Sequence, residues 1–310
     1  MRHAEITIEE GVYEIRADLK SPVNGGDWGV ILAHGGIVNR KSLSRTGFCM
    51  AEYLCRELGA YVLTPDMMGE TRVHKSGGLS FEDSVDILGI SIDYLSDVIG
   101  VERIVGFGHS LGSHVLANAV ESSGKVVAAS TYGGPTAPGN MGRYLKYMSG
   151  ILKVGFLRNM KVSVNDFSKL FDEETREYFY NVMMKRDEYG GNYYTLEYEL
   201  SYLLDSIDFL ISYVDRFSSW GRPVLVSFGE NDSVVRSSKH RYRDRERMGN
   251  IEFRVIPGGC HITPCREEPV EISKLRPIRD FLECNLASPD DDIMYREYLD
   301  VQNPDLVAEE

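Results

Sequence analysis

The stretch Val101–Ser123 reads V-E-R-I-V-G-F-G-H-S-L-G-S-H-V-L-A-N-A-V-E-S-S and combines two hydrophobic patterns. Its first half holds the short apolar run 103–107, which is typical of a strand buried on both faces. Its second half repeats apolar residues at helical spacing: Leu111, Val115, Leu116 and Ala119. The stretch therefore predicts a buried strand that runs directly into a helix.

Between the strand and the helix lies Gly108-His109-Ser110-Leu111-Gly112, which places Ser110 in a tight turn. A Cβ atom at Gly108 or Gly112 would crowd the strand against the helix. Such a turn raises the Ser110 hydroxyl above the sheet, beside the free N–H groups of a helix N-terminus. A glycine-flanked loop with a solvent-facing serine is the simpler alternative, but it does not explain the strand before and the helix after.

This G-x-S-x-G pattern in its strand–turn–helix context resembles the nucleophile elbow of the α/β-hydrolase superfamily. The resemblance covers the chain except residues 138–220 and the C-terminal tail. It implies an α/β-hydrolase fold, in which a mostly parallel central sheet carries helices on both faces and an inserted helical cap.

The remaining sequence alternates in agreement with this fold class. Residues 4–9 and 11–18 predict an antiparallel hairpin. Further strands are expected at 28–33, 60–64, 126–131, 223–228 and 251–256, and helices at 46–58, from Ser80 to about Leu95, and at 268–286 with a kink or restart at Pro277. Ser80 and Asp83 form a capping box at the start of their helix. Alternating strands and helices predict parallel strands joined by crossovers.

Residues 138–220 break the alternation with two long helical patterns and no convincing strand, one pattern following Ser163 and the other starting at Leu196. The predicted division is a core of residues 1–137 and 221–287, a cap of 138–220 and an acidic tail of 288–310. The cap holds ten of the 18 tyrosines and six of the 12 phenylalanines. Most of these rings are expected to pack the cap on the core, and a few to line an apolar pocket.

Composition and charge exclude several classes of function. The 310 residues are 43% hydrophobic and 26% charged, as in ordinary globular proteins, and no apolar run is long enough to span a membrane. The net charge is −13, and the tail alone carries eight acidic residues against one arginine. We therefore expect no nucleic-acid partner and no membrane insertion. The first residues alternate like a strand and lack the apolar core of a signal peptide, so a cytoplasmic location is expected.

The five cysteines are scattered and contain no C-x-x-C pair, so we expect reduced thiols and no metal site. Cys260, His261 and Cys265 are close in sequence, but they supply too few ligands for a zinc site.

A serine hydroxyl needs an adjacent base to act as a nucleophile. The resemblance implies the order serine, acid, histidine, and only His240 and His261 follow a plausible acid. His240 lies in a charged helical pattern that is typical of a solvated surface. His261 lies in the glycine-rich loop after the predicted strand 251–256, and this loop favours His261 as the base.

The acid is expected after the strand 223–228. The run Gly229-Glu230-Asn231-Asp232 resembles the family's acid turn and implies Asp232 as the partner of the histidine, with Glu230 as the competitor. Some family members carry the acid one strand earlier, but residues 125–140 contain no Asp or Glu.

The resemblance also implies an oxyanion hole made by the N–H groups of Leu111 and Gly36. Gly36 belongs to His34-Gly35-Gly36, which is similar to the family's H-G-x loop. His34 is expected to support that loop, and no catalytic role is expected for His109.

The sequence thus predicts a serine hydrolase that cleaves a carboxylic ester through Ser110, His261 and Asp232, with no cofactor and no metal. The expected partner is a small-molecule acyl substrate with an apolar or aromatic part, and the sequence also allows a homo-oligomer. The same residues permit cleavage of amides, peptides, thioesters or C–C bonds, or perhydrolysis. A non-catalytic protein that uses the fold to bind a ligand, and an acidic tail that docks on a partner, remain alternatives.

Overall fold

The fold is taken from a computed structural model of the chain. The residues it describes are 1–36, 39–44, 50–68, 70–74, 79–135, 161–163, 197–199, 213–232, 235, 247–261, 263–265 and 269–286.

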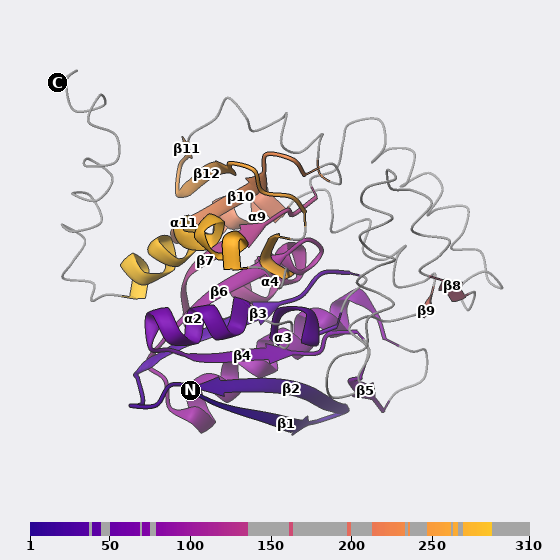
Figure 1. Ribbon diagram of the computed structural model, residues 1–310. Helices are drawn as coiled ribbons and strands as arrows, with labels where there is room; N and C mark the ends of the chain where they lie inside the picture. The colour runs from indigo at the N-terminus through magenta and orange to yellow at the C-terminus, as the bar shows by residue number, and fades with distance from the viewer. Residues whose placement is uncertain are drawn as a thin grey trace, which may run out of the picture.

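A single large sheet runs through the molecule (Figure 1). Its strands are β1 (Arg2–Glu10), β2 (Tyr13–Ser21), β3 (Trp28–Ala33), β4 (Tyr61–Pro65), β5 (Arg72–Val73), β6 (Arg103–His109), β7 (Val126–Tyr132), β10 (Val224–Gly229), β11 (Arg247–Met248) and β12 (Ile251–Ile256). Their order in the sheet is β1-β2-β4-β3-β6-β7-β10-β12-β11, and β5 pairs with β2.

The middle of this sheet is parallel. From β4 through β3, β6, β7 and β10 to β12, each strand pairs in parallel with the next. The outer strands β1, β2 and β11 pair antiparallel. The carboxyl ends of the parallel strands consequently meet at one edge of the sheet, where ligand sites of such folds form.

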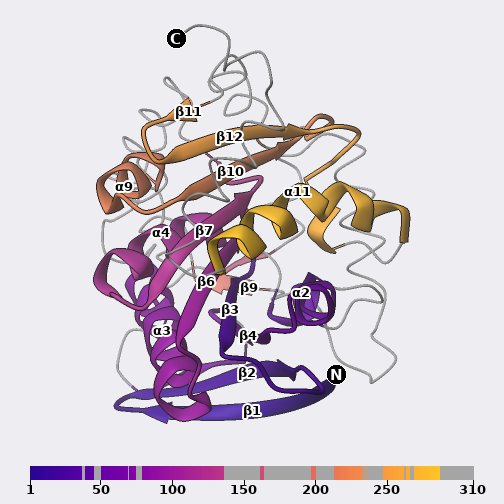
Figure 2. The same cartoon turned by 90° about the vertical axis from the view of Figure 1, so that its left-hand side faces the viewer.

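Helices cover both faces of the sheet, as Figure 2 shows. They are α1 (Lys41–Ser44), α2 (Met50–Leu58), α3 (Phe81–Tyr94) with the π-helical turn η1 (Leu95–Ile99), α4 (Gly112–Ser122), α9 (Tyr213–Trp220) and α11 (Pro269–Leu286). Helices α3, α4 and α9 lie on one face, and α2 and α11 lie on the other. None of the described helices combines the length and apolar character needed to cross a bilayer.

Each face of the sheet has its own hydrophobic core because strand side chains alternate between faces. In β3, Val30 and Leu32 enter the core under α2 and α11, whereas Ile31 and Ala33 enter the core under α3 and α4. All four side chains are fully buried. A strand buried on both faces reads as an unbroken apolar run, which is the pattern that predicted it.

Several elements confirm the sequence prediction closely. Strands β3 and β12 have the predicted limits, and β1 and β2 form the predicted hairpin around Gly11. The Ser80 hydroxyl accepts a hydrogen bond from the Asp83 N–H, and the Asp83 carboxylate accepts one from the Ser80 N–H. This capping box begins α3 as predicted.

The segment predicted as a purely helical cap differs in its described parts. Residues 161–163 and 197–199 are strands β8 (Lys161–Ser163) and β9 (Glu197–Glu199), which pair antiparallel. The helix predicted from Leu196 is therefore wrong at its start, because strand pairing overrides the local helical spacing. Most of the predicted cap, the helix predicted after Ser163, the charged helical pattern around His240 and the acidic tail lie outside the described residues.

Helix α9 closes the predicted cap segment and packs against α4 on the core. Its Tyr213 and Phe217 side chains are fully buried in the core shared with α3 and α4. Helix α11 agrees closely with the predicted limits, and it continues through Pro277, so the helix does not restart there.

Candidate active site

The predicted site residues follow the carboxyl ends of neighbouring parallel strands. Gly36 follows β3, Ser110 follows β6, Asp232 follows β10 and His261 follows β12. Because these strands are parallel neighbours in the central sheet, apart from the intervening β7, their carboxyl ends share one edge. The topology therefore gathers residues that lie up to 225 positions apart, from Gly36 to His261.

Ser110 occupies a strained turn between β6 and α4. Its φ angle is 52°, and it is the one non-glycine residue with positive φ in the described part of the chain. A methyl group on Gly112 would lie 2.2 Å from the carbonyl oxygen of Ala33, and one on Gly108 would lie 2.7 Å from Ser113 Cα. Both glycines are thus required by close backbone approach, as the sequence pattern predicted.

Ser110, His261 and Asp232 lie in hydrogen-bonding order. His261 Nε2 lies 3.0 Å from Ser110 Oγ, and His261 Nδ1 lies 3.0 Å from Asp232 Oδ2. The Asp232 side chain is fully buried and that of His261 is 8% exposed. Since an ionised carboxylate only accepts hydrogen bonds, Nδ1 carries the proton and Nε2 presents its lone pair to the serine hydroxyl.

The two carboxylates that competed for the acid position have different partners. Asp232 Oδ1 accepts a hydrogen bond from the Val235 N–H, which leaves Oδ2 directed at His261. Glu230 is exposed and accepts a hydrogen bond from the Gly258 N–H at 2.8 Å. Glu230 therefore braces the turn that leads to His261, while Asp232 contacts the imidazole. The competing base, His240, lies outside the described residues.

Gly36 and Leu111 lie next to each other beside Ser110. A methyl group on Gly36 would lie 3.0 Å from Leu111 Cδ2. Leu111 immediately precedes α4, so its N–H belongs to the first turn, where N–H groups have no intrahelical acceptor. This arrangement brings together the two residues expected to stabilise an oxyanion.

His34 orients the peptide group between Gly35 and Gly36. The Met67 N–H donates a 2.9 Å hydrogen bond to His34 Nε2, so the ring proton resides on Nδ1, which donates at 2.9 Å to the Gly35 carbonyl. In a planar trans peptide the N–H of Gly36 points opposite to that carbonyl. The fully buried His34 thus supports the loop, as expected from the sequence.

His109 has a structural role that sequence reasoning missed. Its Nε2–H donates a 2.8 Å hydrogen bond to the carbonyl oxygen of His261, and the two ring centroids lie 5.2 Å apart. Burial, followed by the neighbouring His261, lowers the pKa of His109 from 6.5 to about 3. A neutral His109 therefore couples the turn at Ser110 to the loop that carries His261. The position of His109 directly before Ser110 was the one hint of a role near the site, but the sequence did not show its distant partner, the His261 carbonyl.

The end of β7 also contacts the site. Gly133 has a φ of 63°, and a methyl group there would lie 2.9 Å from His261 Nδ1 and 3.1 Å from Asp232 Oδ2. Tyr132 donates a hydrogen bond from its hydroxyl to the Cys260 carbonyl at 2.9 Å. The glycine after Tyr132 is therefore a packing requirement of the histidine–aspartate pair, and the sequence showed only that a glycine followed a strand.

The side chains of Cys55, Cys260 and Cys284 are free thiols. No cluster of three or more histidine, cysteine or acidic side chains suited to a metal ion occurs among the described residues. The Cys260 Sγ atom lies 3.6 Å from the Thr263 hydroxyl. At this edge of the sheet the structure brings together a serine hydroxyl, an imidazole, a carboxylate and backbone N–H groups.

No protein-family model matches the sequence, and no curated protein matches it either. Solved structures do match the fold. A soluble variant of monoglyceride lipase from Saccharomyces cerevisiae is 15% identical, with a TM-score of 0.66, covering 91% of this chain and 95% of the other. A monoacylglycerol lipase from Paleococcus ferrophilus is 17% identical, with a TM-score of 0.63, covering 88% of this chain and 99% of the other.

A thermophilic esterase from Thermogutta terrifontis is 16% identical, with a TM-score of 0.54, over 91% of this chain and 99% of the other. At these identities the comparison concerns the fold alone. The strand order, the helices on both faces and these likenesses together confirm the predicted fold class: the chain has the fold of the α/β-hydrolase superfamily.

Proposed function

We propose that this chain is a serine hydrolase that cleaves a carboxylic ester through an acyl-enzyme intermediate. The observation that carries the proposal is the placement of the His261 ring, whose two nitrogens lie 3.0 Å from Ser110 Oγ and 3.0 Å from Asp232 Oδ2. These distances lie within hydrogen-bond reach, which is the geometry that a base-activated nucleophile requires.

In the first half of the reaction, Ser110 Oγ attacks the ester carbonyl carbon while His261 Nε2 accepts the hydroxyl proton. Asp232 holds the Nδ1–H tautomer and stabilises the imidazolium that forms. The carbonyl oxygen becomes an oxyanion, and the N–H groups of Gly36 and Leu111 are the proposed donors to it. Removing a single donor of this kind costs about 10²- to 10³-fold in kcat.

The tetrahedral intermediate then expels the alcohol, which takes the proton from His261 Nε2, and Ser110 remains acylated. In the second half, a water molecule gives its proton to His261 and attacks the acyl carbon. Collapse of the second intermediate releases the carboxylic acid and returns the proton to Ser110 Oγ. Every proton passes through one imidazole nitrogen, the one directed at Ser110.

The names of the similar structures support an ester as the bond cleaved, because they are monoglyceride lipases and esterases. We therefore propose a small-molecule acyl ester with an apolar part as substrate. The aromatic-rich segment 138–220, a few of whose rings were predicted to line an apolar pocket, lies mostly outside the described residues. Amide, thioester and C–C bond hydrolysis and perhydrolysis use the same residues, and a cytoplasmic location remains a prediction.

The test combines covalent labelling with turnover. A fluorophosphonate probe should label the wild-type protein once per chain, and Ser110→Ala should abolish both labelling and hydrolysis of p-nitrophenyl esters. Ser113→Ala is the matched control, because Ser113 is a nearby buried serine whose Oγ donates to the Gly108 carbonyl. Equal labelling of the wild type and Ser110→Ala would refute the assignment.

A panel of acetyl, butyryl and octanoyl esters, with the corresponding anilides and thioesters, then identifies the bond. Ester turnover well above anilide turnover is expected. A protein that binds the esters without turnover, and without labelling at Ser110, would instead be a ligand-binding member of the fold.

A further inference from the structure

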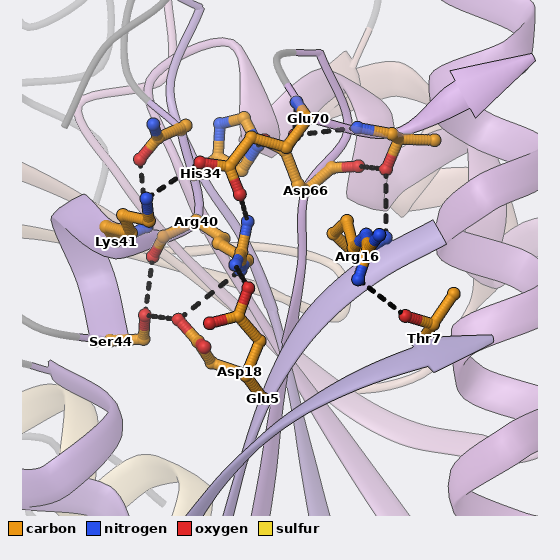
Figure 3. A network of polar contacts seen from close by, with 12 residues as sticks. Glu5, Thr7, Arg16, Asp18, His34, Arg40, Lys41, Ser44, Asp66 and Glu70 are labelled. Carbon is orange, nitrogen blue, oxygen red and sulfur yellow. Dashed lines mark hydrogen bonds and ion pairs between the residues drawn. The ribbon is translucent and has the colours of Figure 1, made fainter. Parts of the chain in front are cut away.

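A buried arginine lies at the carboxyl edge of the sheet, beside the loop that carries Gly36. The side chain of Arg40 is completely buried. It lies between the strands β1 and β2 and the chain segments that follow β3 and β4 (Figure 3). Arg40 is four residues after Gly36 and directly precedes α1.

Each nitrogen of the guanidinium group meets a carboxylate from a different segment. Nη1 donates to Glu70, Nη2 donates to Glu5 at 2.6 Å, and Nε forms an ion pair with Asp18 at 3.5 Å (Figure 3). Burial alone would lower the pKa of Arg40, but Asp18 and Glu70 outweigh it and the pKa is raised. Arg40 is thus a permanent cation that joins β1, β2 and the segment after β4.

Hydrogen bonds close the turn of chain at residues 39–44, and Asp18 attaches this turn to β2. The Ser44 N–H donates to the Arg40 carbonyl at 3.1 Å, and the Lys41 N–H donates to Asn39 Oδ1 at 3.0 Å. Asp18, which is fully buried, contacts both Arg40 and the Ser44 hydroxyl. The position of this turn relative to the sheet is therefore set from β2.

The segment after β4 holds the Gly36 loop at both of its ends. At one end, His34 accepts the Met67 N–H. At the other end, Arg40 and Lys41 both bind Glu70, with Lys41 Nζ at 2.7 Å from Glu70 Oε1. Met67 and Glu70 both follow β4, and the Glu70 N–H donates to the Asp66 carboxylate.

Gly36 thus lies between two attachments to the segment after β4, one made by His34 and one by the buried cation Arg40. We propose that Arg40 is a positioning residue for the oxyanion hole, which holds the Gly36 N–H in place through its contacts with Glu70 and Asp18. This inference rests on the function proposed above. It assigns Arg40 a role in stabilising the transition state, although its side chain touches neither the substrate nor Ser110.

A purely structural role makes a different prediction. Disturbing one partner of a buried ion pair destabilises a protein, because the other charge is left buried without its full compensation. If Arg40 only supported the fold, its replacement would lower the melting temperature and the fraction of active protein, but each active molecule would turn over normally. If it positions Gly36, the loss would appear in kcat and in the binding of transition-state analogues.

The central variant is Arg40→Lys, which keeps the charge but cannot reach three carboxylates at once because it lacks the planar fork of donors. We expect kcat for p-nitrophenyl butyrate to fall by about 10- to 100-fold, with KM within about twofold of the wild type. Active sites are counted by the end point of fluorophosphonate labelling. Arg16→Lys is the matched control, since Arg16 lies on β2 and its guanidinium has an exposed contact to Thr7 and a partly buried one to Glu14.

A reversible trifluoromethyl ketone supplies the second measurement. It forms a hemiketal oxyanion in the hole, so its affinity should fall in Arg40→Lys by the same factor as kcat. The matching secondary alcohol cannot form an oxyanion, and its affinity should stay within about twofold. Equal losses for ketone and alcohol, or an unchanged kcat per active site, would overturn the inference.

If Arg40→Lys fails to fold, Glu70→Ala is the second variant. Glu70 is 37% exposed, so its removal leaves no buried charge of its own, and Arg40 keeps its contact with Asp18. The same selective loss in kcat and ketone affinity is expected, with Glu14→Ala as control. A wild-type protein that is neither labelled nor active would refute the proposed function and this inference together, whereas an active wild type with an unaffected Arg40→Lys refutes this inference alone.

Discussion

Replacing His109 by glutamine should make the stability of this protein less sensitive to acid. His109 is buried and neutral, and burial together with the neighbouring His261 lowers its pKa from 6.5 to about 3. Its Nε2–H donates to the His261 carbonyl at 2.8 Å. A glutamine side chain can place an N–H donor near the same position but does not titrate, so the variant separates the proton equilibrium from the hydrogen bond.

The sign and size follow from proton linkage. Between pH 6.5 and 3 this histidine is protonated in the unfolded chain and neutral in the folded chain, so the unfolded state binds more protons and stability falls as the pH falls. Each pH unit below 6.5 lowers the free energy of unfolding by about 1.4 kcal/mol. At pH 5.0 the wild type should have lost about 2 kcal/mol through His109, a loss that is absent at pH 7.5 and absent in the variant.

The assay is urea unfolding at pH 7.5 and 5.0 at constant ionic strength, followed by tryptophan fluorescence. The free energy of unfolding should drop between these pH values by about 2 kcal/mol more in the wild type than in His109→Gln. His74→Gln, at an exposed histidine, is the control and should retain the wild-type drop. Equal drops in the wild type and His109→Gln would show that His109 titrates normally in the folded protein and would refute the argument.

Four further substitutions test the geometry around His261. Asp232→Asn should lower kcat by about 10⁴-fold and Glu230→Gln far less, because Asp232 contacts the imidazole whereas Glu230 binds the Gly258 N–H. Steady-state ester kinetics measure both variants, and the reverse ranking would contradict the assignment of the acid. Gly133→Ala should lower kcat per labelled active site by about 100-fold, since the added methyl displaces His261; normal turnover would mean that the loop yields without harm. His109→Phe should cost about 1–3 kcal/mol in urea unfolding at pH 7.5, because it leaves the His261 carbonyl without its donor, and an unchanged midpoint would exclude that contribution.

Local signals in the sequence were sufficient for most elements of the core. Strand β3 is a short apolar run, and β12 alternates apolar with charged residues before it ends in Val255 and Ile256; both strands have their predicted limits. The capping box at Ser80 is a contact between residues three apart, so its signal is contained within the helix that it starts. The short strands β8 and β9 escaped prediction because three residues carry no pattern of their own and pairing alone defines them.

For the candidate site, the sequence determined which residue types follow which strands: a serine between glycines, an aspartate after β10 and a histidine after β12. Their roles were inferred from a family resemblance, and their catalytic part remains a proposal. What brings them within 3.0 Å of one another is the order of parallel strands in the sheet.

Only the tertiary structure decided which side chains support these residues. His109 and the His261 carbonyl are 152 residues apart, Arg40 and Glu70 are 30 apart, and Gly133 meets His261 across the end of β7. In each case the local sequence gives no sign of the contact, because the fold of the sheet brings the partner from a distant part of the chain. Hydrophobic periodicity and turn chemistry act over a few residues and can be read along the chain, whereas a buried hydrogen bond or a close backbone approach depends on where distant segments meet.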